Sequence, residues 1–487
     1  MTDETELKLE LTMEGAALVE ASSLLPGKPA WVEQYSTYFD TPNCLLFKAG
    51  LSLRIRLANG ARTQTVKGDG ANAAALFVRS EWERSVADDR PILDDTTPIS
   101  SLLCEKVREI APIFKVDVIR QIWIIKEGKT LIEVALDRGE VIAGDRSAPI
   151  CEIEFELKSG NTSDLFAWAR RIDGVTPVHL GLLSKAERGY RLRSAMPESA
   201  KAEPVTLEKK MTADVAFQKI AHSCLLQFRL NEVLIEDQNP DALHQARVGL
   251  RRLSSALTTF KPILTDEAFP VIRANIRWLA GELGRARDLD VLAARATNQE
   301  LHERLETARI DAYSRIQEVL ESKRARACML DLAEWIADGR WLSQPDARFE
   351  RKLASKVFAR EVLHRLHKKV KKAGNLTKLG DEKLHKVRKN AKKLRYAAEF
   401  FASLYNGKDA RRRHKSYINA LERLQNELGV LNDFAVAPAV LARIGIENNL
   451  GSELLLSRSK KADLLIAAAK AHHDLTDAKG FWGSHCK

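Results

Sequence analysis

Charged side chains recur at every second residue along several segments of the first half of the chain. Near the N-terminus, Glu4, Glu6 and Lys8 alternate with small or apolar residues. Because successive side chains of a strand point to opposite faces, these charges share one face. Carboxylates so gathered can hold a hard divalent cation, and Arg and Lys can grip phosphate oxygens. The same spacing returns downstream at Arg54, Arg56, Lys67, Arg79, Glu81, Glu83, Asp137, Glu152 and Glu154.

Two arrangements of strands would position these charges. An antiparallel sheet with its polar face in water explains each strand taken alone. Opposite charges at matching positions in successive segments favour instead a closed barrel with this face inward, whose lumen would also receive Arg120 and Lys185. Charge buried at that density is costly unless it is paired or neutralised by a ligand. Helices are expected to interrupt the strands at 12–25, 98–111 and 161–172.

The second half of the chain has the three- and four-residue apolar spacing of helices and contains an internal repeat. The segment beginning at His244 aligns with the one beginning at His385, and Leu283-Gly284 aligns with Leu428-Gly429 at nearly the same offset. In the segments beginning at His244 and His385, the histidine and several basic residues fall on one face of the expected helix. The basic positions of the two segments are Arg247, Arg251 and Arg252 in the first, and Arg388, Lys392, Lys393 and Arg395 in the second.

Composition supports this division of the chain. Residues 1–200 carry 25 Lys and Arg against 30 Asp and Glu, while the remainder carries 52 against 36, which is typical of a polyanion-facing module. A small, polar, proline-interrupted stretch separates the halves, so we predict domains at 1–195 and 207–487 joined by a linker at 196–206. The six cysteines form no CxxC pair, and no apolar run is long enough to span a bilayer. A cytoplasmic protein without a membrane partner is therefore expected.

The first half resembles the CYTH (triphosphate tunnel metalloenzyme) superfamily. Its Glu-x-Glu-x-Lys hallmark stands at Glu4-Thr5-Glu6-Leu7-Lys8, and Leu53-Arg54-Ile55-Arg56, Glu152-Ile153-Glu154 and Ser184-Lys185 follow in order. The resemblance implies an eight-stranded antiparallel tunnel that hydrolyses a phosphoanhydride with Mg²⁺ or Mn²⁺. It further implies catalytic roles for Lys8, Glu6 and Glu154, metal ligands at Glu4, Glu6, Asp137, Glu152 and Glu154, and triphosphate contacts at Lys8, Arg54, Arg56, Lys67, Arg79, Arg120 and Lys185.

The second half resembles the CHAD domain, a helical module that binds inorganic polyphosphate and often follows a CYTH domain. The resemblance implies an all-α domain that docks polyphosphate on the basic residues of both repeats: His244, Arg247, Arg251, Arg252, His385, Arg388, Lys392, Lys393 and Arg395. The fold class expected for the whole chain is therefore α+β, a β tunnel joined to a duplicated helical bundle.

The resemblance leaves several functions open. Members of the family act on inorganic triphosphate, thiamine triphosphate or nucleotides, and no segment of residues 1–193 has the pattern of a nucleobase slot, which favours inorganic triphosphate. A non-catalytic protein that binds polyphosphate or targets it to granules is the alternative from another class. Nucleic acid is the main rival ligand for the helices, but they lack interleaved aromatic residues for base stacking, so no specific nucleic acid partner is expected.

Overall fold

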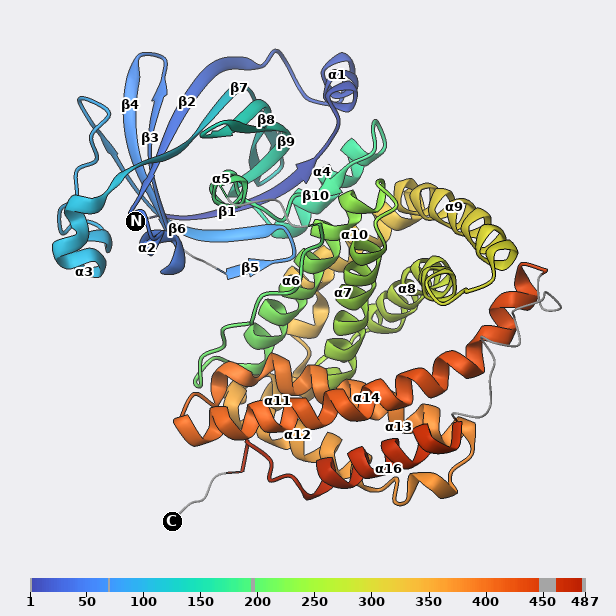
Figure 1. Ribbon diagram of the computed structural model, residues 1–487. Helices are drawn as coiled ribbons and strands as arrows, with labels where there is room; N and C mark the ends of the chain where they lie inside the picture. Colours follow the sequence, from blue (N-terminus) through green and yellow to red (C-terminus); the bar gives the residue numbers. More distant parts are fainter. Residues whose placement is uncertain (1, 69–70, 194–197, 446–460, 484–487) are drawn as a thin grey trace. The chain divides into compact units, whose positions relative to one another are not determined.

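A computed structural model of the chain describes residues 2–68, 71–193, 198–445 and 461–483 (Figure 1). It divides into two compact units, one made of Met1–Pro197 with Glu321–Gly339 and the other of Glu198–Leu320 with Arg340–Lys487. The strands are β1 (Thr2–Glu10), β2 (Ala30–Asp40), β3 (Leu51–Ala58), β4 (Ala61–Gly68), β5 (Ala71–Ala73), β6 (Leu76–Ser85), β7 (Ala111–Glu127), β8 (Thr130–Ala143), β9 (Arg146–Ser159) and β10 (His179–Leu180).

Eight antiparallel strands close into a barrel, in the order β1-β9-β8-β7-β2-β3-β4-β6. Closure depends on β1, which pairs on one side with β9, placing Lys8 opposite Glu154, and on the other with β6, placing Glu4 opposite Arg79. The short strands β10 and β5 extend the sheet at its ends. The closed eight-stranded tunnel predicted from the sequence is thus confirmed.

Five helices accompany the strands: α1 (Met13–Ala21), α2 (Leu45–Lys48), α3 (Ile99–Leu103), α4 (Thr162–Asp173) and α5 (Lys185–Leu192). Apolar side chains of the barrel mostly face outward, where Leu53, Ile55 and Val66 pack with residues of α2 and α3. The lumen is left to polar side chains, as the alternation predicts. The three predicted helical segments are confirmed, whereas α2 and α5 were not foreseen.

Helix α5 packs on β7, β8 and β9 and brings Lys185 to the lumen. A capping box starts it, in which the Ser184 hydroxyl accepts from the backbone N–H of Glu187 and the Glu187 carboxylate accepts from that of Ser184. Tyr190 donates to the buried carboxylate of Asp40 at 2.8 Å. Because both ends of α5 are held, its position and that of Lys185 are set by the barrel.

Gly189 permits α5 to lie against Phe114, and a side chain there should be destabilising. A Cβ at this position would meet three ring carbons of Phe114 at 2.2–2.5 Å. We expect Gly189→Ala to lower the free energy of unfolding by about 1–3 kcal/mol through overpacking. Denaturant unfolding would measure this. Gly281→Ala is the control, because its Cβ would meet nothing within 4 Å and alanine favours a helix; equal stability of the two variants would contradict the packing argument.

The second half of the chain is helical, as predicted, and the order of its elements repeats. The helices α6, α7 and α8, with short 3₁₀ turns on either side of α7, are matched by α12, α13 and α14, with 3₁₀ turns on either side of α13. The helices are α6 (Ala213–Glu232), α7 (Pro240–Thr259), α8 (Ala268–Ala293), α9 (Gln299–Glu321), α10 (Lys323–Asp338), α11 (Arg348–Lys352), α12 (Ser355–Lys371), α13 (Asp381–Phe400), α14 (Lys408–Arg443) and α16 (Lys461–Asp477). Among the residues described, no helix is both long and apolar enough to cross a bilayer.

Helix α10 lies inside the range assigned by sequence to the helical domain, but it packs with the barrel unit. Its main partner is α4, which in turn packs on β1 and β9. Arg326 donates to Asp173 at 2.5 Å, and Arg170 donates to Asp331 at 2.7 Å and to Glu334 at 2.5 Å. These ion pairs join two helices that are about 160 residues apart in the chain.

Candidate active site and basic cluster

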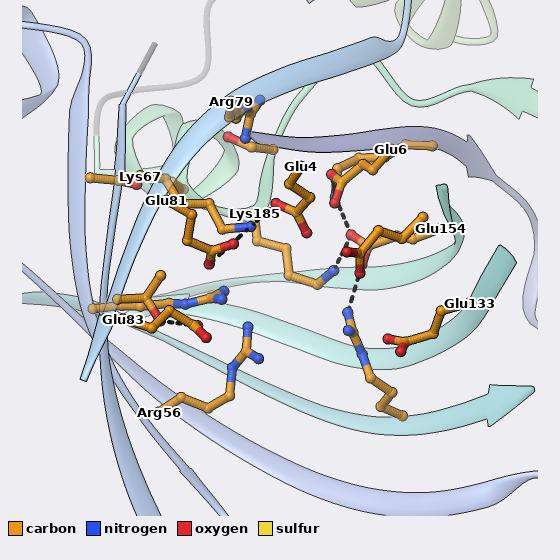
Figure 2. A pocket seen from close by; sticks show the side chains of 18 of the residues that line it. Glu4, Glu6, Arg56, Lys67, Arg79, Glu81, Glu83, Glu133, Glu154 and Lys185 are labelled. Carbon is orange, nitrogen blue, oxygen red and sulfur yellow. Dashed lines mark hydrogen bonds and ion pairs between the residues drawn. The ribbon is translucent and has the colours of Figure 1, made fainter. Parts of the chain in front are cut away.

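The lumen of the barrel contains a pocket of about 330 Å³ whose lining is almost entirely charged or polar. Glu4, Arg54 and Glu154, which come from three different strands, all line it. Figure 2 shows acids and bases from opposite walls pointing into one space. The described lining residues are Glu4, Glu6, Lys8, Tyr38, Ser52, Arg54, Arg56, Thr65, Lys67, Arg79, Glu81, Glu83, Arg120, Glu133, Glu154, Glu156, Lys158, Ser184, Lys185 and Ala186. The structure therefore brings together residues that the sequence pattern could only assign to a common face.

Three carboxylates form a buried group at this pocket: Glu154 lines it, whereas Asp137 and Glu152 lie behind the lining residues. Asp137 and Glu152 are opposite each other on β8 and β9 and are fully buried, and Glu154 is 7% exposed. One oxygen from each lies within 4.8 Å of the others. Three hard anionic oxygens at this spacing are the donors that Mg²⁺ and Mn²⁺ take, so these residues fit a divalent cation.

Three cations contact Glu154 of this triad. Lys185 Nζ lies 2.6 Å from Asp137 Oδ2 and 2.8 Å from Glu154 Oε1, and it also contacts Glu152. Arg120 donates two hydrogen bonds to Asp137, at 2.6 and 2.7 Å, and one of 2.6 Å to Glu154. Lys8 contacts Glu154 and lies 2.8 Å from Glu6. Burial alone would favour neutral acids, but these positive charges hold the pKa of Glu154 well below its usual range and lower those of Asp137 and Glu6.

The remaining predicted metal ligands have different neighbours. Glu6 belongs with the triad through Lys8, which bridges it to Glu154. Glu4 pairs at 2.5 Å with Lys67, which is also 3.4 Å from Glu81 (Figure 2). Glu4 therefore lines the same pocket but lies in a separate group of charges.

Arg54, Arg56 and Arg79 differ from the other cations, because none of them forms an ion pair with a described carboxylate. Arg54 lies 3.5 Å from the Tyr38 hydroxyl, and Arg79 lies over the Phe77 ring. The buried Nε atoms of Arg54 and Arg56 have no hydrogen-bond partner. Burial and the neighbouring charges of Arg54 and Arg120 lower the pKa of Arg56 to about 10. Guanidinium groups so placed are suited to bind an anion with several oxygens.

Tyr38 is a lumen residue that sequence reasoning missed. It is buried, stacks on Phe114 at a ring distance of 4.6 Å and lines the pocket. Burial opposes ionisation of its phenol, but Arg54 and Arg56 outweigh that effect and lower its pKa. The signal was present in the alternation of Gln34, Ser36 and Tyr38 along β2, but these three side chains carry no formal charge, so the alternation of charges does not include them.

The basic residues of the two helical repeats meet where α7 packs on α13. Burial and the charges of Arg251, Arg388, Arg247 and Arg395 together lower the pKa of Lys392 to about 7. The pKa of His244 is lowered to about 4 by burial and by Arg287, Arg251 and Arg247. We call this group, formed by His244, Arg247, Arg251, Arg388, Lys392 and Arg395, the basic cluster.

Three described acids contact members of the basic cluster. Arg247 lies 3.5 Å from Asp288, and Arg395 lies 3.4 and 3.6 Å from Glu399 and Glu422. Gly284, which aligns with Gly429 of the second repeat, leaves space for Arg247, because a Cβ at this position would lie 3.1 Å from the Arg247 guanidinium. A face with this excess of positive charge is suited to bind a polyanion.

The structure does not bring every predicted basic residue into this cluster. Arg252 is buried, donates to Gln227 at 3.0 Å and lies over the Phe400 ring. Lys393 lies among Lys369, Arg273 and Lys389, which together with burial lower its pKa. His385 is exposed on α13.

Comparison with known proteins agrees with this architecture. Among curated proteins, the chain is similar to an inorganic triphosphatase of Haemophilus influenzae, with 36% identity over 166 residues. These residues are 33% of this chain and 46% of that protein, so the chain spans about half the length of this curated relative.

Among solved structures, matches cover different shares of the chain. The CHAD domain of Ricinus communis covers 56% of this chain and 96% of its own, with 28% identity and a TM-score of 0.48. The Hippeastrum protein HpAC1, for which a dominant triphosphatase activity is described, covers 38% of this chain and 93% of its own, with 17% identity and a TM-score of 0.29.

Family models give the assignment directly. The model described as CYTH domain matches residues 2–190, and the model described as CHAD domain matches residues 219–442. The chain therefore contains a CYTH domain at residues 2–190 followed by a CHAD domain at residues 219–442.

Proposed function

We propose that this protein is a divalent-metal-dependent inorganic triphosphatase, which hydrolyses triphosphate to diphosphate and phosphate, and that its helical domain docks inorganic polyphosphate. One observation carries the first part. The buried triad of Asp137, Glu152 and Glu154 reaches the pocket through Glu154. The same pocket is lined by Arg54 and Arg56, which lack carboxylate partners in the described structure. The curated relative named inorganic triphosphatase supports the same reaction.

The residues divide the work of phosphoryl transfer between them. Asp137, Glu152 and Glu154 would hold Mg²⁺ or Mn²⁺, with Glu6 beside them. When bound, the ion supplies charge neutralisation and lowers the pKa of a bound water. Arg54, Arg56 and Arg79, together with Lys67, bind the phosphate oxygens and hold the chain of phosphates in line. Lys8 and Arg120, on the strands beside the triad, place positive charge where negative charge develops in the transition state.

The pocket lining favours an inorganic over an organic triphosphate. Tyr38 is the one aromatic residue among the described lining residues, and it is already stacked on Phe114. A base or thiazole ring would need an apolar surface to displace water, and the lumen offers charged groups instead. Thiamine triphosphate and nucleotides are therefore the weaker substrate candidates.

Phosphate release by the full-length protein tests this proposal. We expect steady turnover of triphosphate with Mg²⁺ or Mn²⁺, none with EDTA, and kcat/KM at least about 100-fold lower for ATP and thiamine triphosphate. Faster turnover of either organic substrate would reassign the enzyme. The absence of any turnover above the protein-free blank would instead favour a non-catalytic polyphosphate-binding or granule-targeting protein.

The basic cluster supports the second part of the proposal and has a pH dependence. The pKa of Lys392 is about 7 in the free protein. It should rise when a bound polyanion offsets the positive charges of Arg251 and Arg388. Below pH 7 Lys392 is charged in both states, whereas above pH 7 binding must take up a proton. We expect the affinity for long-chain polyphosphate to fall as pH rises from 6.5 to 9, by up to about tenfold per pH unit.

Variants of α13 separate this effect from general electrostatics. Lys392→Met should weaken binding at pH 6.5 and flatten the pH dependence, as measured by titration at constant ionic strength. Lys383→Met, on the exposed first turn of the same helix, removes the same charge outside the cluster and should leave the pH dependence unchanged. Identical pH profiles for both variants would contradict the role of Lys392.

A further inference from the structure

Lys185 lies among the three carboxylates of the candidate metal site. Among the described residues, its ammonium is the one group that contacts all three carboxylates of the triad, at 2.6 Å from Asp137, at 2.8 Å from Glu154 and in contact with Glu152. Its side chain is 9% exposed. The ammonium therefore takes the position and the oxygen contacts that a divalent cation would take.

The acids of the lumen are already balanced by the chain's own bases. Glu6, Asp137, Glu152 and Glu154 are buried, and the bases in contact with them are Lys8, Arg120, Lys185 and Arg188. A divalent cation added to this group would leave an excess of positive charge. A phosphate anion bound by Arg54 and Arg56 would offset that excess. The anion therefore favours binding of the cation.

We propose that Lys185 is an exchangeable counter-ion, which a divalent cation displaces from Asp137, Glu152 and Glu154 and which then binds the phosphate anion. The exchange couples the two ligands, so each raises the affinity for the other by the same factor. This inference deepens the proposed function and rests on it for the identity of the anion.

Lys185 is better suited to this exchange than the other two cations. Arg120 holds Asp137 with two hydrogen bonds from its planar fork, and Lys8 lies 3.9 Å from Glu152. Lys185 is instead a compact charge on a flexible four-carbon stem, and it stands at the first position of α5. Its neighbours Ser184 and Ala186 also line the pocket, so a displaced ammonium remains in the lumen.

Mn²⁺ binding to the full-length protein tests the exchange without any turnover. Electron paramagnetic resonance of free Mn²⁺ gives the affinity, alone and with inorganic phosphate, which chelates the ion weakly. We expect wild type to bind Mn²⁺ at least tenfold more tightly with phosphate present. Lys185→Met should bind Mn²⁺ alone at least tenfold more tightly than wild type and should lose most of the enhancement by phosphate.

Two further variants make the result specific. Lys158→Met removes another lysine of the same pocket, which pairs with Glu156 at 2.5 Å and with Glu133 at 3.7 Å but not with the triad. It should bind Mn²⁺ as wild type does. Lys185→Arg keeps the charge and should keep weak binding of Mn²⁺ alone. Unchanged or weaker Mn²⁺ binding by a folded Lys185→Met overturns the exchange.

The wild-type measurement keeps the inference testable if Lys185→Met does not fold, because the absence of enhancement by phosphate in wild type also overturns it. Failure of the exchange can be told apart from failure of the proposed function. Normal triphosphate hydrolysis with no effect of Lys185 on Mn²⁺ affinity rejects the exchange alone. Coupled Mn²⁺ and phosphate binding without hydrolysis of triphosphate rejects the enzymatic function alone.

Discussion

We expect replacement of Glu154 with glutamine to lower kcat for triphosphate hydrolysis by at least about 100-fold, the upper end of the loss found for residues that only support a metal ligand. Glu154 is a member of the carboxylate triad and contacts Lys8, Arg120 and Lys185. The amide has nearly the same shape but carries no charge. The substitution would therefore remove a proposed metal ligand and leave the three cations in contact with it with fewer acids. Steady-state phosphate release at saturating Mg²⁺ measures the effect.

Glu140→Gln is the matched control for this variant. Glu140 lies on β8 with its side chain exposed, so the same change of charge there should leave turnover unaffected. Circular dichroism of both variants checks that the barrel is folded. Turnover of Glu154→Gln within a few-fold of wild type would remove Glu154 from the metal centre.

Arg56→Ala should produce two effects of opposite sign. Removal of a donor aimed at developing charge costs roughly 100- to 1,000-fold in rate, which we expect in kcat/KM for triphosphate. The melting temperature without ligand should rise by a few degrees. The reason is that the guanidinium is buried beside Arg54 and Arg120, with its Nε unpartnered and its pKa lowered to about 10. A charge that destabilises the free protein and favours catalysis is typical of a binding site.

Arg84→Ala separates this result from the general loss of an arginine. Arg84 lies on β6 and forms two hydrogen bonds of 2.8 Å with Asp94 near the surface. Its loss should leave kcat/KM unchanged and should not raise the melting temperature. A lower melting temperature for Arg56→Ala, with unchanged kcat/KM, would indicate that Arg56 is a structural residue.

Local alternation was enough to predict many of the charges that line the pocket. The period of two along β1 places Glu4, Glu6 and Lys8 on one face, and a barrel follows once several strands carry the same pattern. The pairing of particular acids with particular bases could not be predicted. It depends on the register between strands far apart in the chain, which sets Lys8 opposite Glu154 at a separation of 146 residues.

Helical details show the same limit. Lys392 and Lys393 are adjacent in sequence, but one residue turns a helix by about 100°, so they face different neighbours. Arg252 is in register with the basic face but donates to Gln227 on another helix, a contact that no local pattern contains. Helix α10 has many apolar residues, as expected of a helix in either domain. It packs with the barrel unit, where it forms ion pairs with α4.

The position of the metal and the anion is the central claim, and anomalous X-ray scattering from crystals grown with Mn²⁺ and inorganic phosphate tests it most directly. The account predicts a manganese peak within bonding distance of Asp137, Glu152 and Glu154, with Lys185 moved onto phosphate held by Arg54 and Arg56. A peak outside the barrel, with Lys185 still in contact with the three carboxylates, would contradict it.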